Sequence, residues 1–133
     1  MDNLCPCGST KLLDCCCGLL HSGEKYAKTP KQLMRSRYSA YALGGLGEYL
    51  LSTWHPKMIE GLSVAALSEK SNTWLRLDII DYSQQGDEGI VEFKAYYVSK
   101  ENSENYLHER SYFQRLNGRW FYVSAVNKKS PPA

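Results

Sequence analysis

Alternation between apolar and polar residues dominates the second half of the chain. From Thr73 to Tyr82 the alternation predicts a β-strand with Leu75, Leu77 and Ile79 on one face. A second alternating run extends from Glu88 to Ser99. Gln85-Gly86-Asp87 separates these runs and predicts a turn. We therefore expect two antiparallel strands joined by a short connection.

Two further runs, 106–116 and 119–125, flank Asn117-Gly118, which is a strong signal for a two-residue β-hairpin turn. Such a turn fixes which residues face each other across the hairpin. The predicted pairs are Phe113 with Tyr122, Tyr112 with Val123, and Arg110 with Ala125. Both faces of this hairpin are mixed in polarity, so we expect one of them to cover a semi-polar cavity.

The first half of the chain has helical periodicity instead. Thr29 is a candidate N-cap, Pro30 suits the first helical position and Gln32 stands at the capping-box site, so a helix is predicted to begin here. Gly44-Gly45 ends it. Its apolar stripe consists of Leu33, Met34, Tyr38, Tyr41 and Ala42.

Two shorter helices follow in the pattern. One extends from about Leu46 to Trp54 and is closed by Pro56, and the other begins after a Ser63 N-cap and covers 64–70. Helices followed by a long antiparallel sheet make an α+β fold, with about three helices on one face of about four strands.

Composition places the chain among ordinary globular proteins. It has 133 residues, of which 43% are hydrophobic and 23% charged, which suits one domain with an appendage. We find no apolar run long enough to span a membrane and no secretory leader, so neither is expected. Clustered thiols fit a reducing compartment, and the cytoplasm is the expected location.

All five cysteines lie between Cys5 and Cys17, and this cluster predicts a metal site. A structural zinc ion takes four N or S ligands, often as two close pairs, and stabilises a segment too short for a core of its own. Disulfides would staple only one corner of the chain, and one catalytic thiol would not explain five cysteines. An iron–sulfur cluster is the remaining alternative.

The segment Cys5-Pro6-Cys7-Gly8-Ser9, followed by the cysteine triplet and Gly18, resembles the SEC-C motif, the zinc knuckle of the C-terminal tail of the SecA ATPase. The resemblance implies Cys5, Cys7, Cys16 and Cys17 as the zinc ligands. Two alternatives remain open at this stage: Cys15 in place of Cys16, and His21 in place of Cys17.

The distribution of charge argues against nucleic acid as the partner. The formal net charge is +2, and residues 1–45 contain six Lys or Arg against three acidic residues. Four thiolates around Zn²⁺ add a charge of about −2 to that part of the chain. What remains is no dense basic stripe of the kind that binds phosphate backbones.

A larger resemblance covers about residues 4 to 126. It rests on the segments 33–41, 49–50, 53–56, 109–113 and 118–122, which read LMRSRYSAY, YL, TWHP, ERSYF and GRWFY. With the knuckle, these segments look like the YchJ family of uncharacterised bacterial proteins. The resemblance implies a cone-shaped domain similar to nuclear transport factor 2 (NTF2), SnoaL and cystatin-like folds.

We accordingly divide the chain into a SEC-C knuckle and connector (1–25), a cone-like domain (26–126) and a flexible tail (127–133). Many YchJ-like chains carry a second SEC-C motif after the cone, and this sequence contains none. The N-terminal knuckle is therefore the expected metal site.

Two classes of function follow from these expectations. The first is a non-catalytic interaction module, for which the resemblance to the SecA tail implies a protein partner associated with chaperones or the ribosome. The second is a small-molecule-binding protein or enzyme that uses the cone cavity. The module is favoured, because no arrangement of catalytic roles is visible.

Candidate cavity residues are Arg35, Arg37, Tyr38, Trp54, His55, His108, Glu109 and Arg110. Glu109 and Arg110 are neighbours on a strand, so their side chains should take opposite faces. His55 is expected to cap carbonyl groups at a helix end. Arg35 is expected to bind the knuckle or a carboxylate of the sheet through a bidentate hydrogen bond.

Overall fold

The computed structural model describes residues 4–69, 73–99 and 101–127, with the side chains of 126 and 127 left aside. Its strands are β1 (Thr73–Gln85), β2 (Glu88–Val98), β3 (Glu104–Leu116) and β4 (Arg119–Asn127). They form one antiparallel sheet in the order β1-β2-β3-β4. The predicted α+β class and four-stranded sheet are confirmed.

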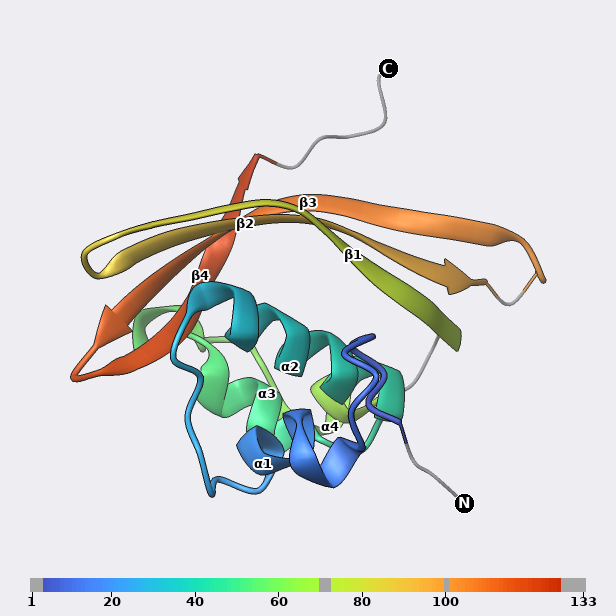
Figure 1. Cartoon of the computed structure of the whole chain (residues 1–133), viewed down its shortest axis with the longest axis horizontal. Coiled ribbons are helices and arrows are strands. Elements are labelled where there is room, and N and C mark those ends of the chain that lie inside the picture. Colours follow the sequence, from blue (N-terminus) through green and yellow to red (C-terminus); the bar gives the residue numbers. More distant parts are fainter. Residues whose placement is uncertain (1–3, 70–72, 100, 128–133) are drawn as a thin grey trace.

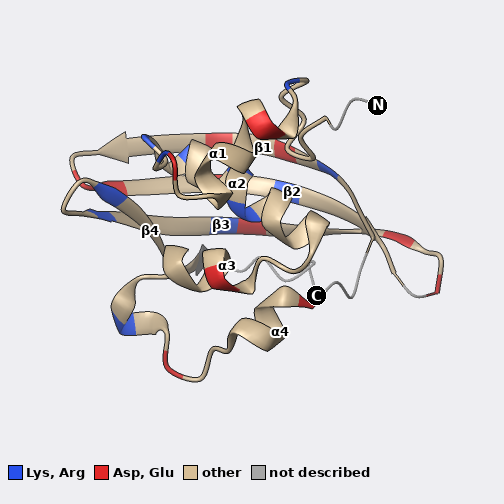
Figure 2. Ribbon diagram, turned by 90° about the horizontal axis from the view of Figure 1, so that it is seen from below, with Lys and Arg blue, Asp and Glu red and all other residues tan. Residues whose placement is uncertain are grey.

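The helices precede the sheet in the chain and cover one of its faces (Figures 1 and 2). They are α1 (Cys17–His21), α2 (Pro30–Leu43), α3 (Gly47–Thr53) and α4 (Val64–Ser68), with 3₁₀ turns η1 (Leu13–Cys15) and η2 (Pro56–Met58). The sheet bows over α2, and α1 with the N-terminal segment lies on the far side of α2 from the sheet (Figure 1).

The predicted helix caps are present, except that the side chain of Gln32 accepts from the backbone N–H of Lys28 at 2.7 Å and not from that of the N-cap Thr29. Thr29 Oγ1 accepts a hydrogen bond from the backbone N–H of Gln32 at 3.0 Å, and Pro30 is the first residue of α2. Gly44 ends the helix at a φ of 74°, a conformation that glycine adopts without strain. Ser63 Oγ caps α4 by accepting from the N–H of Ala66 at 3.1 Å. The predicted end of this helix at Lys70 lies outside the described residues.

The core lies between α2 and the concave face of the sheet. α2 contributes Leu33, Met34 and Tyr38, and the sheet contributes Val91, Phe93, Ala95, Phe113, Trp120 and Tyr122. These side chains are all at most 8% exposed, and Val91 and Phe113 are fully buried. Burial of this apolar area is what holds the helical layer onto the sheet.

The predicted faces of β1 were wrong at Leu75. The register shifts between Trp74 and Arg76, so Leu75 is the extra residue of a β-bulge and is 43% exposed. Trp74 takes the inward position, and Leu77 and Ile79 pack against the core as expected.

Bulges also correct the predicted hairpin register. Phe113 pairs with Tyr122 as expected, but Tyr112 pairs with Ser124 and Arg110 with Asn127. The shift between Tyr112 and Phe113 inserts one extra residue on β4 next to the turn-proximal pairs. Extrapolation from the Asn117-Gly118 turn therefore fails beyond the first bulge.

Within the described ranges, no helix is both long and apolar enough to cross a membrane. The proposed flexible tail falls on residues 128–133, beyond the described part of the chain, apart from Asn127, whose backbone belongs to β4.

Candidate metal centre and central cavity

The knuckle, residues 4–21, is shaped by a tight turn between its first cysteine pair and its cysteine triplet. Leu4 pairs with Leu12, and the N–H of Cys5 donates to the carbonyl of Lys11 at 2.8 Å. Gly8 has a φ of 87°, and its N–H donates to the Cys5 carbonyl at 3.3 Å. Glycine at this place lets the chain reverse within a few residues.

Four sulfur atoms converge inside this turn. The ligand atoms of Cys5, Cys7, Cys16 and Cys17 all lie within 4.8 Å of one another, and the Sγ atoms of Cys7 and Cys16 are 3.7 Å apart. Tetrahedral coordination with Zn–S bonds of about 2.3 Å requires S···S distances of about 3.8 Å. All five cysteines are free thiols. The donor set and its spacing therefore fit a single tetrahedral metal ion.

The two alternative ligands lie outside this group. Cys15 is exposed, whereas Cys5, Cys7 and Cys17 are at most 4% exposed. His21 Nε2 donates to the carbonyl of Ser36 at 2.9 Å. That bond fixes the protonated ring nitrogen and ties α1 to α2.

Ser9 supports the sulfur cluster from outside. Its Oγ accepts from the N–H of Lys11 at 3.2 Å and lies 3.1 Å from Cys16 Sγ. Because the oxygen already accepts from Lys11, its hydroxyl hydrogen is free to point at the sulfur. A hydrogen bond of this kind stabilises a thiolate ligand.

The close approach of the thiols shifts their pKa values in opposite directions. Hydrogen bonding from Cys17 lowers the pKa of Cys7 to about 4. The bond to Cys7 together with burial raises the pKa of Cys17, and burial is the main cause that raises the pKa of Cys16. Deprotonation of one thiol in this cluster thus opposes deprotonation of its neighbours. A bound dication offsets this repulsion.

The knuckle is packed against the rest of the molecule rather than suspended from it. Cys5 Sγ lies 3.6 Å from Ser39 Oγ, a fully buried residue of α2. Gly18 allows α1 to pack close to η1, because a Cβ there would lie 2.6 Å from the carbonyl oxygen of Leu13. The four-cysteine cluster therefore lies against α2 and joins the N-terminal segment to it.

Beside the centre is a groove of about 440 Å³ between the knuckle and the start of α2. Four cationic side chains line it, and none of its lining residues is acidic; the cations are Lys11, Lys25, Lys31 and Arg35. The expected bidentate bond of Arg35 is absent among the described residues, and its buried Nε has no hydrogen-bond partner there. Arg35 adjoins the knuckle without binding a carboxylate.

A second concavity, the central cavity, lies between α2 and the sheet and has a volume of about 290 Å³. Aromatic side chains form most of its wall: Tyr38, Tyr41, Trp54, Trp74, Phe93 and Tyr122. Arg37 and Glu109 are its two charged residues. A cavity is present where the mixed hairpin predicted one, but its wall is mostly apolar and not semi-polar.

Arg37 is only 4% exposed and forms no ion pair among the described residues. Its Nη1 donates to the hydroxyl of Thr53 and to the carbonyl of Leu50. The guanidinium carbon lies 4.4 Å from the ring centre of Tyr122 and 5.2 Å from that of Trp54. Burial lowers the pKa of Arg37, which still leaves a guanidinium group charged at neutral pH.

Glu109 faces the same cavity from β3. Its Oε2 accepts from the hydroxyls of Ser111 at 2.6 Å and Tyr122 at 2.8 Å. Burial and this carboxylate raise the pKa of Tyr122, and burial raises the pKa of Tyr38 to about 12. Both phenols are therefore neutral donors, not bases, at physiological pH.

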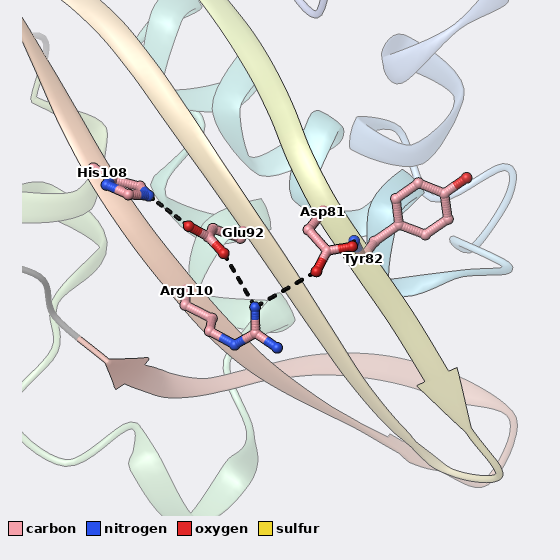
Figure 3. Close-up of polar contacts among 5 residues, drawn as sticks. All are labelled: Asp81, Tyr82, Glu92, His108 and Arg110. Carbon is pink, nitrogen blue, oxygen red and sulfur yellow. Dashed lines mark hydrogen bonds and ion pairs between the residues drawn. The ribbon is translucent and has the colours of Figure 1, made fainter.

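The remaining candidates lie elsewhere. Arg110 takes the outer face of the sheet, opposite to Glu109 as predicted, and its Nη1 lies 3.1 Å from Glu92 and 3.8 Å from Asp81. His108 Nε2 lies 2.7 Å from the other oxygen of Glu92 (Figure 3). This network belongs to the face away from the helices.

The expected role of His55 was wrong. Its Nδ1 accepts from the N–H of Lys57 at 3.1 Å, so the ring caps the start of η2 and not the carbonyls at the end of α3. The backbone N–H of His55 donates to the carbonyl of Tyr122 at 2.8 Å. This bond attaches the segment after α3 to β4. Pro56 at the first position of η2 favours this arrangement.

Comparison with known proteins identifies the family of this chain. A family model described as the middle NTF2-like domain of YchJ matches residues 29–125. A UPF0225 protein of Vibrio parahaemolyticus is 38% identical over 134 residues, which cover 95% of this chain and 76% of that protein. The chain belongs to the YchJ (UPF0225) family.

Other relatives agree with this assignment. A UPF0225 protein of Deinococcus radiodurans is 40% identical, and the match covers 92% of this chain and 88% of that protein. A SEC-C motif containing protein from Rhodopseudomonas palustris has a solved structure with a TM-score of 0.84 at 35% identity, covering 92% of this chain and 96% of its own. The crystal structure of a SEC-C motif containing protein from Psychrobacter arcticus has a TM-score of 0.79 at 27% identity, and the match covers 96% of this chain and 84% of that one.

Sequence reasoning about this YchJ-family chain missed several residues that complete the sites. Tyr122 and Ser111 hold Glu109, Thr53 holds Arg37, and Glu92 with Asp81 binds Arg110. Tyr122 and Ser111 belong to the quoted YchJ-like segments, and that was the available signal. The pairings cross strands and helices, which local sequence patterns do not record.

Proposed function

We propose that the protein is a zinc-binding interaction module. In this proposal the metal fixes the knuckle to α2, and the adjoining groove receives an acidic segment of a protein partner. The observation that carries it is a four-sulfur site next to a groove whose charged lining residues are all cationic.

Zinc is the metal that best suits the site. Four cysteine sulfurs within 4.8 Å of one another suit a single ion, whereas a multi-iron cluster distributes its cysteines over several metal atoms. Soft thiolate donors in a tetrahedral arrangement also disfavour calcium and magnesium, which take oxygen ligands. A bound zinc here has no open position for catalysis, so its role is structural.

Charge complementarity supports an acidic partner. Zn²⁺ with four thiolates carries about −2, and the four groove cations carry +4, which leaves this surface positive by about +2. Over the helical side of the molecule as a whole, including the region of α1, basic and acidic residues are interspersed, so the excess of cations is confined to the groove lining (Figure 2). The likeness to the SecA tail supports a chaperone- or ribosome-associated protein as the partner, and with it a cytoplasmic role.

Native mass spectrometry tests the metal. The native mass is expected to exceed the denatured mass by one zinc ion per chain. A mass excess equal to iron and sulfide, or no excess after purification without chelators, contradicts the zinc assignment.

Titration with an oligoglutamate peptide tests the groove. We expect saturable binding at low salt that weakens as salt screens the charges, and a loss of about tenfold or more in the double variant Lys25→Glu/Lys31→Glu. Lys25→Glu alone is compared with Lys57→Glu, which makes the same charge change at an exposed position of η2 outside the groove. Equal weakening by Lys57→Glu would show nonspecific attraction and refute the docking surface.

A second candidate function is binding of a small molecule in the central cavity, and it is favoured by the two charged residues, Arg37 and Glu109, that line an otherwise mostly apolar wall.

A further inference from the structure

We propose that the central cavity binds a small amphoteric molecule: an organic acid with a ring-sized apolar body and an amino or hydroxyl group beside its carboxylate. Arg37 receives the carboxylate, Glu109 accepts from the amino or hydroxyl group, and the aromatic wall holds the apolar body. The inference is independent of the metal centre and of the docking groove.

The size and lining of the cavity fit such a molecule. Its volume of about 290 Å³ is at the lower end of ligand pockets, which measure about 300–1,000 Å³. Most of the wall is aromatic or aliphatic, with Met34, Ala95 and Leu107 adding to the six aromatic residues. A mostly apolar wall with few convergent polar groups is what a specific small-molecule site requires.

Arg37 has unused hydrogen-bonding capacity. A guanidinium has five N–H donors, and among the described residues only Nη1 has partners, Thr53 and Leu50. A buried cation is costly unless it is paired with an anion, and the aromatic contacts supply only part of that compensation. The guanidinium is therefore prepared for a carboxylate, which it binds in a bidentate manner.

The carboxylate of Glu109 likewise has one oxygen that can accept further hydrogen bonds. Both hydroxyl donors, from Ser111 and Tyr122, bind Oε2, and Oε1 has no hydrogen-bond partner among the described residues. The two bonds hold the carboxylate in place while leaving one oxygen to accept from a ligand. Its negative charge selects an ammonium or hydroxyl group over a second acid.

Tyr122 sets the separation of the two charges. Its ring lies under the guanidinium of Arg37, and its hydroxyl binds Glu109. Both charges thus contact the same tyrosine, and among the described residues they do not form an ion pair with each other. A molecule with neighbouring acidic and donor groups can bind Arg37 and Glu109 at the same time, because Tyr122 contacts both residues and holds them in one site.

The test uses four probes with the same phenyl body and the full-length, metal-loaded protein. L-Phenylalanine has the acid and the ammonium, L-3-phenyllactate the acid and a hydroxyl, 3-phenylpropionate the acid alone, and phenethylamine the amine alone. Binding is followed by the indole N–H signals in ¹H–¹⁵N NMR spectra. Trp54 and Trp74 line the cavity, and Trp120, whose Nε1 donates to the carbonyl of Lys28, is the internal control.

We expect saturable shifts of Trp54 and Trp74 without a shift of Trp120. Phenylalanine or phenyllactate should bind at least about tenfold more tightly than either single-function probe, and which of the two is preferred identifies the donor. No saturation with either two-function probe up to about 10 mM, or equal affinity for phenethylamine, overturns the proposal.

Two variants assign the contacts. Arg37→Lys should weaken every acidic probe about tenfold or more, because an ammonium does not reproduce the bidentate bond. Glu109→Gln keeps an acceptor for Tyr122 and Ser111, and it should weaken phenylalanine while leaving 3-phenylpropionate unchanged. If Arg37→Lys does not fold, the Glu109→Gln comparison still decides: unchanged phenylalanine affinity refutes the bridge.

Discussion

At the scale of single residues, Cys15 and Cys16 form a natural pair for testing the metal centre. They are adjacent and chemically identical, yet only Cys16 Sγ belongs to the sulfur group, while Cys15 is exposed. We expect Cys16→Ser to lose most of its bound metal and to melt at a lower temperature, and Cys15→Ser to behave like the unmodified chain. Metal per chain by mass spectrometry measures this. Retention by Cys16→Ser together with loss by Cys15→Ser would reverse the ligand assignment.

His21 predicts a dependence of stability on pH. Burial lowers its pKa from the usual 6.5, although the bond to the Ser36 carbonyl opposes that shift. The unfolded chain therefore takes up a proton at a higher pH than the folded chain does, so the free energy of unfolding should fall as the pH drops below 6.5.

The measurement is NMR titration of the His21 ring with denaturation at several pH values. His21→Gln keeps a donor for the Ser36 carbonyl but does not titrate, so its stability should fall less over the same pH interval. A ring that protonates above pH 6.5 would contradict this prediction.

The scale of the element is where the β1 bulge matters. Leu75 and Leu77 are both on the apolar face that simple alternation predicts, but the structure exposes Leu75 and packs Leu77 against the core. Leu77→Ala should lower the free energy of unfolding by about 1–2 kcal/mol, because the side chain is only partly buried. Leu75→Ala should change it by less than about 0.5 kcal/mol. Urea denaturation of both variants is the measurement. Equal losses in the free energy of unfolding would contradict the bulge at Leu75.

The same elements show how far local patterns reach. Capping of α2 by Thr29 and of α4 by Ser63 was predictable because a cap is satisfied within three residues of sequence. The pairing of Phe113 with Tyr122 was predictable from the Asn117-Gly118 turn. The bulges on β4 that change the partners of Tyr112 and Arg110 carry no turn-type signal in the sequence, so the register beyond the turn-proximal pairs was not predictable.

At the scale of the whole molecule, the cysteine cluster and the main core are distinct clusters of buried side chains. Cys5, Cys7 and Cys17 pack together and contact α2 through Cys5 and Ser39, whereas the core between α2 and the sheet contains none of the cysteines, and Leu20 is the knuckle residue that joins that core. Chelation should therefore increase amide hydrogen exchange in residues 4–21 and on the adjoining side of α2, with β2 and β3 unchanged. Hydrogen exchange read by mass spectrometry, with and without a chelator, measures this.

Adding zinc back is the control for that experiment. Protection of residues 4–21 should return with one equivalent of the metal. Exchange that rises equally across β2 and β3 would show that the knuckle and the sheet unfold together, and an unchanged knuckle would show that metal does not hold it.

The sequence by itself determined the α+β class, the helix starts and the cysteine cluster, because these depend on periodicity, caps and spacing over a few residues. It also indicated the YchJ-like segments that the family comparison confirmed. The tertiary structure alone decided how those parts meet. It gathers four sulfurs and excludes Cys15, and it brings Arg37 and Glu109 into one cavity through Tyr122. Such contacts join residues far apart in the chain, and their geometry follows from packing rather than from local preference.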